Sequence, residues 1–190
     1  MSGNDPLELE ARVRVAHELL AAHLEGPVAA EPWIQTVEYD AELRRWYVRF
    51  GCDGRDATTI YFDLHQRTLR FEVYFLPDPQ ANHLALYRFL LQRNHNLYGA
   101  RFSIGPDGDV YLTGRVALEH LTVDELDRII GVLYEIVEQT FPSTIALVYP
   151  GAAARRATPE SPERADDGAT PVAEVSDTEA HDIEVHDIES

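Results

Sequence analysis

The chain has 190 residues, of which 45% are hydrophobic, and a formal net charge of −17. Its length favours one globular domain with an appendage, and its acidity argues against a general nucleic-acid binder because it repels phosphates. The single cysteine, Cys52, excludes an intramolecular disulfide. No stretch has the pattern of a signal peptide or approaches the roughly 20 apolar residues of a membrane helix, so we expect a cytoplasmic protein without a membrane partner.

Residues 6–24 have the pattern of an amphipathic helix. Asp5 can cap it, and Pro6 suits the first helical position. Apolar side chains that recur at helical spacing place one face against a core, and they are Leu9, Val13, Ala16, Leu20 and Leu24. Gly26 and Pro27 are expected to end this helix.

Three consecutive runs in the middle of the chain alternate apolar and polar residues, at 45–50, 58–64 and 68–75. Alternation with many β-branched and aromatic residues predicts antiparallel strands that bury one face. Residues 33–39 alternate more weakly and are a further candidate strand. Residues 52–56 contain Gly and Asp and predict the turn between the first two runs.

A second helix is expected to begin at Asp78 and Pro79 and to end at Gly99. Its apolar residues cover an arc of about 160°, which is wider than the ~100° that a sheet-covering helix needs. Phe89 lies outside this arc, so we expect Phe89 to contact a partner copy in a homodimer. The alternative is that the first helix or residues 145–149 cover the additional apolar surface of this helix within one chain. Asn94 lies inside the arc, so we expect it to make a structural hydrogen bond to backbone near the helix end or in the turn that follows.

The last predicted elements are a hairpin and a third helix. Residues 101–116 alternate on both sides of a Gly-Pro-Asp-Gly turn at 105–108. Thr122 and Glu125 form a capping box for a helix that Pro142 is expected to limit. This order of elements predicts an α+β fold, with an antiparallel sheet of about five strands flanked by helices.

The composition changes after Pro150. Residues 151–190 hold three Arg against eleven Asp and Glu, a net charge of −8, and they have no aromatic residue. Such a segment cannot bury enough apolar surface to fold, so we expect a domain at 1–150 and a disordered acidic tail at 151–190. His181 and His186 near the end are residue types that can bind a metal ion. We interpret them as part of a solvated acidic tail and expect no metal site.

No motif in the sequence carries catalytic chemistry. Dinucleotide-binding, Walker-type and GxSxG patterns are absent from the 190 residues. Cys52 is followed by Asp53 and Asp56, which disfavour the thiolate that a nucleophilic cysteine needs. We therefore expect a protein that is not an enzyme and has no cofactor.

One group of side chains suits recognition. These residues point away from the apolar face of the predicted strands, and they are the Tyr and Arg that are enriched at interfaces. The candidate binding residues are Arg45, Tyr47, Arg49, Tyr61, Arg70, Tyr74, Arg101, Tyr111 and Arg115. A solvated sheet face with cross-strand pairs explains the same pattern, and both interpretations stay open.

The order of elements and several segments resemble the YbjN domain family. The likeness covers about residues 33–142, and the segments that carry it are RTL at 67–69 with Glu72, LLQRN at 90–94, Phe102 with DGDVYL at 107–112, and Leu121-Thr122 with Glu125-Leu126. The first of these is similar to an actinobacterial branch of the family. The resemblance implies a bacterial α-β-β-β-α-β-β-α domain, commonly dimeric, related in fold to type III secretion chaperones and without known catalytic residues.

These expectations combine into one functional hypothesis. We expect a non-enzymatic protein-binding or chaperone-like module that acts as a homodimer and binds an unidentified protein or peptide. The alternative is a small-ligand or regulatory sensor domain. An enclosed apolar pocket with convergent polar groups favours the sensor, whereas an exposed apolar groove or an edge strand favours peptide binding.

Overall fold

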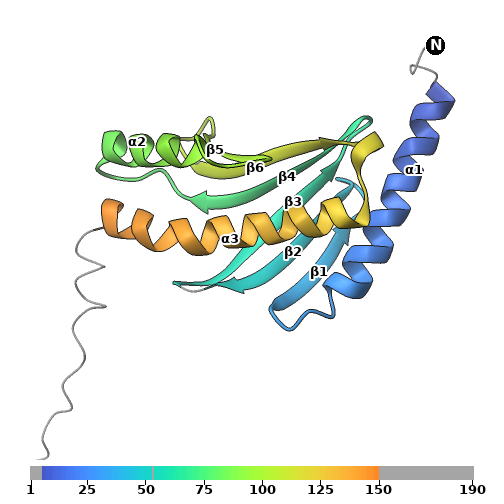
Figure 1. The fold of residues 1–190 in the computed structure, drawn as a ribbon, viewed down its shortest axis with the longest axis horizontal. Helices are drawn as coiled ribbons and strands as arrows, with labels where there is room; N and C mark the ends of the chain where they lie inside the picture. Colours follow the sequence, from blue (N-terminus) through green and yellow to red (C-terminus); the bar gives the residue numbers. More distant parts are fainter. Residues whose placement is uncertain (1–5, 53, 150–190) are drawn as a thin grey trace, which may run out of the picture. The chain divides into compact units, whose positions relative to one another are not determined.

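The computed structural model describes residues 6–52 and 54–149. The expected cap at Asp5 and the expected tail at 151–190 lie outside these residues. The described elements are three α-helices and one antiparallel sheet (Figure 1). The predicted α+β class is therefore confirmed.

The sheet has six strands rather than about five, in the spatial order β1-β2-β3-β4-β6-β5. The candidate strand at 33–39 accounts for the difference, because it forms β1. The strands are β1 Ile34–Asp40, β2 Arg45–Cys52, β3 Arg55–Leu64, β4 Thr68–Leu76, β5 Ala100–Ile104 and β6 Val110–Ala117. All neighbouring strands are antiparallel, and β1 and β5 form the two edges.

The helices pack on one face of this sheet (Figure 1). They are α1 Pro6–His23, α2 His83–Asn94 and α3 Val123–Val148, with a π-helical turn at Leu24–Val28 and a 3₁₀ turn at Leu118–His120. Ring contacts show this packing. The ring centroids of His17 on α1 and Trp46 are 5.0 Å apart, and those of Tyr134 on α3 and Phe50 are 5.4 Å apart. Trp46 and Phe50 are fully buried, so the core lies between the helices and this face.

The first helix begins at Pro6 as expected, and its predicted face is buried except for half-buried Val13. Gly26 and Pro27 do not end it. The chain widens into a π-helical turn in which the N–H of Ala29 donates to the carbonyl of Leu24 at 3.0 Å. Burial of Leu24 and Val28 on the core favours this continuation.

The start of α2 differs from the prediction, because the helix begins at His83 and not at Pro79. The residue before a proline avoids helical angles, and the N–H of Asp78 donates to the Asp109 carboxylate at 2.9 Å instead. Asn82 precedes the helix with a positive φ of 62° and donates its side-chain amide to the carbonyl of Leu147 at 3.0 Å. These contacts hold residues 77–82 outside the helix.

The end of α2 also differs, because the helix stops at Asn94, before Gly99. The chain then turns through Gly99, whose φ of 78° requires the left-handed region that glycine tolerates. Arg128 of α3 lies over the ring of Tyr98 in this turn, 5.3 Å from its centroid. The turn therefore packs on α3 and delivers the chain to the edge of the sheet.

The third helix has the expected cap, since the Thr122 hydroxyl accepts a hydrogen bond from the N–H of Glu125 at 3.1 Å. Pro142 does not limit it, and α3 continues to Val148. A proline inside a helix costs roughly 3 kcal/mol. Phe141 and Val148 are buried on this last part of the helix, and burial of such apolar side chains at about 1.5–3 kcal/mol each offsets that cost.

Candidate binding surfaces

The nine candidate Tyr and Arg residues all lie on the sheet face opposite the core, which we call the open face. Strand register aligns them in rows, because Arg45 is opposite Asp63, Asp63 is opposite Arg70, and Arg70 is opposite Arg115. Tyr47 likewise faces Tyr61, and Tyr74 faces Tyr111. No helix of the described residues packs on this face. The sheet therefore brings these residues together as the alternation predicted.

Acidic partners already neutralise part of the open face. Arg45 donates to both oxygens of Asp63, at 2.6 and 3.1 Å, and Arg70 lies 3.6 Å from the same carboxylate. Arg70 also contacts Glu72. The hydrogen bond to Asp63 raises the pKa of the Arg45 guanidinium, so Arg45 stays charged. Arg45 and Arg70 therefore belong to a cross-strand network and have little charge left for a ligand.

The tyrosines on this face also pair with each other. Tyr47 and Tyr61 pack edge to face with centroids 5.5 Å apart, and Tyr74 and Tyr111 do so at 5.6 Å. Burial, followed by the charge of Asp109, raises the pKa of both Tyr74 and Tyr111. These phenols therefore stay neutral and serve as flat, polar-tipped contact surface.

Three candidate arginines have no acidic partner within the described residues. Arg49 donates to the side chain of Gln35 at 3.1 Å. Arg101 and Arg115 are exposed and make no side-chain interaction there. Two of these three arginines lie at the β5 and β6 side of the open face, and Arg49 lies on β2.

Phe89 does not have the exposed position expected from the helical arc. It is half-buried against the core, and the guanidinium of Arg93 covers its ring at 5.3 Å. The exposed large hydrophobic residues of α2 are Leu84 and Leu91, with 75% and 67% of their surface accessible. Their spacing of two helical turns places both on the same face.

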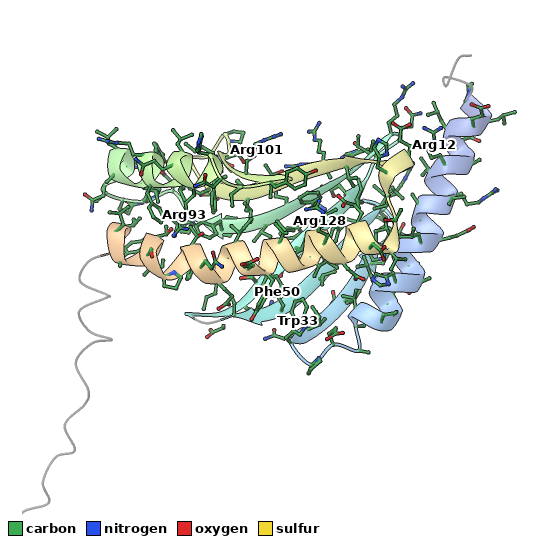
Figure 2. The ribbon with its side chains drawn as sticks, viewed as in Figure 1. Arg12, Trp33, Phe50, Arg93, Arg101 and Arg128 are labelled. Atoms are coloured by element: carbon green, nitrogen blue, oxygen red, sulfur yellow. The ribbon has the colours of Figure 1, made fainter. Side chains whose placement is uncertain are left out.

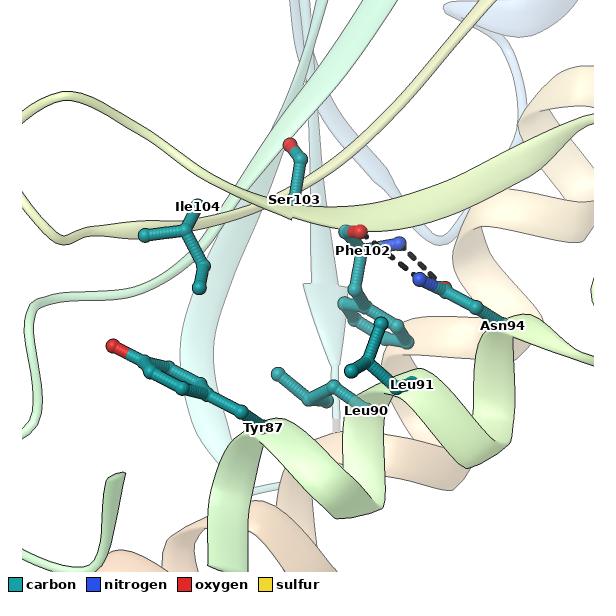
Figure 3. Close-up of a pocket in the computed structure, with 7 residues that line it drawn as sticks. All are labelled: Tyr87, Leu90, Leu91, Asn94, Phe102, Ser103 and Ile104. Carbon is teal, nitrogen blue, oxygen red and sulfur yellow. Dashed lines mark hydrogen bonds between the residues drawn. The ribbon is translucent and has the colours of Figure 1, made fainter. Parts of the chain in front are cut away.

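A groove runs between α2 and the edge strand β5 (Figure 3). It has a volume of about 290 Å³ and is lined by Tyr87, Leu90, Leu91, Asn94, Phe102, Ser103 and Ile104. Leu91 and Ile104 are 67% and 51% exposed on its sides. The sequence indicated excess apolar surface on this helix but not the opposing strand, because that placement depends on the tertiary fold.

Asn94 closes one end of this groove. Its side chain accepts from the N–H of Phe102 at 2.7 Å and donates to the carbonyl of Phe102 at 3.0 Å. The expected structural hydrogen bond is thus present, but its partner is strand β5 rather than the helix end or the turn that follows it. The dashed lines in Figure 3 show both bonds.

A second hollow, of about 350 Å³, lies beside the end of α1 and contains a buried histidine. His23 contacts Asp127 of α3 at 2.6 Å, and Trp33 lines the same hollow. Over the described part of the chain, no three His, Cys, Asp or Glu side chains are grouped to hold a metal ion. None of the helices described is long and apolar enough to cross a membrane.

Comparison with known families identifies the domain. The model of the YbjN family, described as "Putative bacterial sensory transduction regulator", matches residues 21–145. This match covers more than half of the chain, and the chain therefore belongs to the YbjN family. The family resemblance of the sequence is confirmed.

Curated relatives match part of the chain. An uncharacterized protein of Mycobacterium leprae is 32% identical over 105 residues, which are 55% of this chain and 57% of the relative. One of Mycobacterium tuberculosis (strain H37Rv) is 37% identical over 82 residues, or 43% of this chain and 45% of the relative. The chain thus spans about half the length of the curated relatives it matches.

Two solved structures are similar in fold. The ExsC-ExsE complex matches with a TM-score of 0.49 and 17% identity, over 66% of this chain and 90% of the other. The ExoU-SpcU complex from the type III secretion system of Pseudomonas aeruginosa matches with a TM-score of 0.41 and 16% identity, over 55% and 84% of the two chains.

Proposed function

We propose that this domain is a non-enzymatic protein-binding module that holds an apolar segment of a partner in the α2–β5 groove. The observation that carries the proposal is the exposure of Leu91 and Ile104 on opposite sides of this groove. Apolar surface gathered in a groove beside an edge strand is a recurring peptide-binding arrangement. A chaperone-like role would use the same contact to shield the segment from water.

The chemistry of the groove favours binding over reaction. Its hydroxyls belong to Tyr87 and Ser103, and neither is hydrogen-bonded to a basic side chain in the described residues. The amide of Asn94 is engaged by the main chain of Phe102. Without a base beside a nucleophile, the groove lacks the arrangement of covalent or acid–base catalysis.

A regulatory sensor of a small ligand is the alternative, and the printed description of the family is regulatory. Its best site is the hollow lined by His23, Trp33 and Asp127. The polar groups of His23 and Asp127 already bind each other, so they offer less to a ligand than the open apolar groove offers to a peptide.

The proposal includes a homodimer formed through the open face. The paired tyrosines, together with Arg45 and Arg70 and their acidic partners, provide a surface on β2, β3 and β4 that can be buried without unpairing those charges. Phe89, covered by Arg93, contributes less than expected to self-association. Light scattering at tens of micromolar protein tests the dimer: Tyr61→Asp should give a monomer and Phe89→Asp should not, whereas a monomeric parent would refute it.

Site-specific photo-crosslinking tests the binding groove. A photoreactive phenylalanine analogue placed at position 91 should crosslink one discrete partner in extract of the host. The matched control is the same analogue at Leu43, which is 59% exposed in the turn between β1 and β2. Equal crosslinking at both positions, or none at position 91, would refute the groove as the binding site.

A further inference from the structure

The hollow beside the end of α1 combines an aromatic ring, apolar side chains and two carboxylates. Trp33 supplies the ring, and Val28 and Ile130 are among the apolar residues that line the hollow. The carboxylates belong to Glu31 and Asp127. This hollow shares no lining residue with the α2–β5 groove, so a ligand here is independent of the proposed peptide binding.

The ring of Trp33 is held in place by its neighbours. Its centroid lies 5.0 Å from that of Tyr134 on α3 and 6.0 Å from that of Phe50 on β2. The carbonyl of Trp33 accepts the N–H of Gly51 at 3.3 Å. Figure 2 labels Trp33 and Phe50 beside α3. The half-buried indole is therefore fixed before a ligand arrives, which lowers the entropic cost of binding.

The hollow has negative charge that the described residues do not compensate. One oxygen of Asp127 contacts His23 at 2.6 Å, whereas the exposed Glu31 side chain has no partner in the described part of the chain. The chain has no lysine, and none of the described residues that line the hollow is arginine. Arg128, the neighbour of Asp127 in sequence, donates to Glu125 instead. A cation that enters the hollow therefore meets an unpaired carboxylate.

Gly131 leaves space in the hollow. A Cβ built on this residue of α3 would meet nothing within 4 Å, and Gly131 lines the hollow. The total volume of about 350 Å³ is large enough for a small organic molecule. A bare metal ion does not suit this hollow, because no three metal-binding side chains are grouped within the described residues.

We infer that this hollow binds a small amine, with its ammonium group at Glu31, Asp127 and the Trp33 ring and its alkyl chain on the apolar lining. Carboxylates attract the ammonium group by charge, and the face of an indole attracts cations through its quadrupole. The net charge of −17 also favours the approach of cations. The inference adds an amine-binding site to the proposed peptide-binding function.

The two tryptophans of the chain provide a probe and an internal control. Trp33 lines the hollow, whereas Trp46 is fully buried in the core. The indole N–H signals of both can be followed by NMR in the ¹⁵N-labelled full chain, and Trp33→Phe assigns them. The ligands are n-butylammonium, n-butanol and butyrate, which share one alkyl chain and differ in charge.

Butylammonium should shift the Trp33 signal and leave the Trp46 signal in place. It should bind about five- to tenfold more tightly than butanol, as expected for exposed charge pairs combined with a cation–π contact. Butyrate should bind most weakly. High salt should weaken butylammonium and leave butanol unchanged, because salt screens only the charged ligand.

Matched variants locate the site. Glu31→Gln should weaken butylammonium about three- to fivefold and leave butanol unchanged. Glu10→Gln removes an exposed carboxylate from α1 and should leave both unchanged. Gly131→Leu fills the open space and should abolish binding of all three ligands, with an unchanged Trp46 signal as evidence that the core remains folded.

A lysine peptide separates the two sources of the same chemical group. The side chain of lysine ends in butylammonium, so acetyl-Ala-Ala-Lys-Ala-Ala-amide presents this group on a polypeptide. The peptide should bind no more tightly than butylammonium itself. Tenfold tighter binding of the peptide would assign the hollow to a lysine of a partner protein and overturn the inference of a small amine.

The remaining outcomes also decide the inference. Equal binding of butylammonium and butanol, or an equal effect of Glu31→Gln and Glu10→Gln, would overturn the cation selection. An unmoved Trp33 signal with tens of millimolar butylammonium would overturn the site. None of these results bears on crosslinking at position 91, so the proposed function stands or fails separately.

Discussion

The side-chain amide of Asn94 forms two hydrogen bonds with the main chain of Phe102, at 2.7 and 3.0 Å. Phe102 lies on an edge strand, where unpaired N–H and C=O groups would otherwise face water or another chain. One asparagine therefore takes the place of a neighbouring strand at this residue, and it fixes the end of α2 to the sheet.

Replacing Asn94 with Leu should destabilise the domain. The change leaves the N–H and C=O of Phe102 without partners, which costs about 1–3 kcal/mol. The melting temperature should fall by roughly 2–4 °C for each kcal/mol of stability lost. Asn96→Leu, at an exposed position two residues later, is the control and should be nearly neutral. An unchanged melting temperature for Asn94→Leu would contradict the structural role of this amide.

Gly114 and Gly131 should respond to alanine in opposite directions. A Cβ at Gly114 on β6 would collide with the ring of Phe71 and with the carbonyl of Gly99, and the latter is backbone that cannot rotate away. A Cβ at Gly131 on α3 would meet nothing within 4 Å. Urea unfolding should show a loss of stability for Gly114→Ala and a gain of about 0.5–1 kcal/mol for Gly131→Ala. Equal effects would mean that the packing at Gly114 is looser than described.

Glu125 should contribute a pH-dependent part of the stability. Arg128 donates two hydrogen bonds to its carboxylate, at 2.6 and 2.7 Å, and these lower the pKa of Glu125 below its ordinary value of 4.5. Because the folded-state pKa is the lower one, this stabilisation is present above the unfolded-state pKa and is lost as the pH falls through the folded-state pKa.

The Glu125→Gln variant tests that linkage. It should be less stable than the parent near neutral pH, and the difference should shrink as the pH falls below about 4. Urea unfolding at several pH values measures this difference. Glu10→Gln changes an exposed glutamate of α1 and should have little effect at any pH. A difference for Glu125→Gln that does not change with pH would exclude the ionised pair as its cause.

Removal of residues 151–190 should leave the fold intact. This expectation comes from their composition, since they lie outside the described residues, and the melting temperature should fall by less than about 5 °C. Removal of residues 141–190 is the contrasting truncation, because it also deletes the buried Phe141, Thr144 and Val148 and should unfold the domain. A larger fall for the shorter truncation would contradict the predicted domain boundary.

Local patterns in the sequence predict those features whose causes are local. Alternation assigned Tyr47 and Tyr61 to the same sheet face, because side chains along a strand point to opposite faces in turn. Thr122 and Glu125 predicted the start of α3 because the capping bond joins residues three apart. Such features need no knowledge of distant segments.

Features that depend on distant contacts were missed. The late start of α2 depends on Asp78 meeting Asp109 and on Asn82 meeting Leu147. The α2–β5 groove depends on the placement of Leu91 beside Ile104, which helical periodicity cannot supply. Sequence reasoning therefore identified the surplus apolar surface of α2 but assigned the exposed position to Phe89.

The pairing of β4 with β6 has a consequence for how the domain folds. Strands β1 to β4 follow one another in both chain and sheet, and β5 pairs with its neighbour β6. Among the strand pairings of residues 6–52 and 54–149, only that of Thr68–Leu76 with Val110–Ala117 closes a long loop, which contains α2 and β5. Closing a long loop costs entropy before its contacts form, so the meander and the hairpin should acquire protection from hydrogen exchange first, and the β4–β6 amides last.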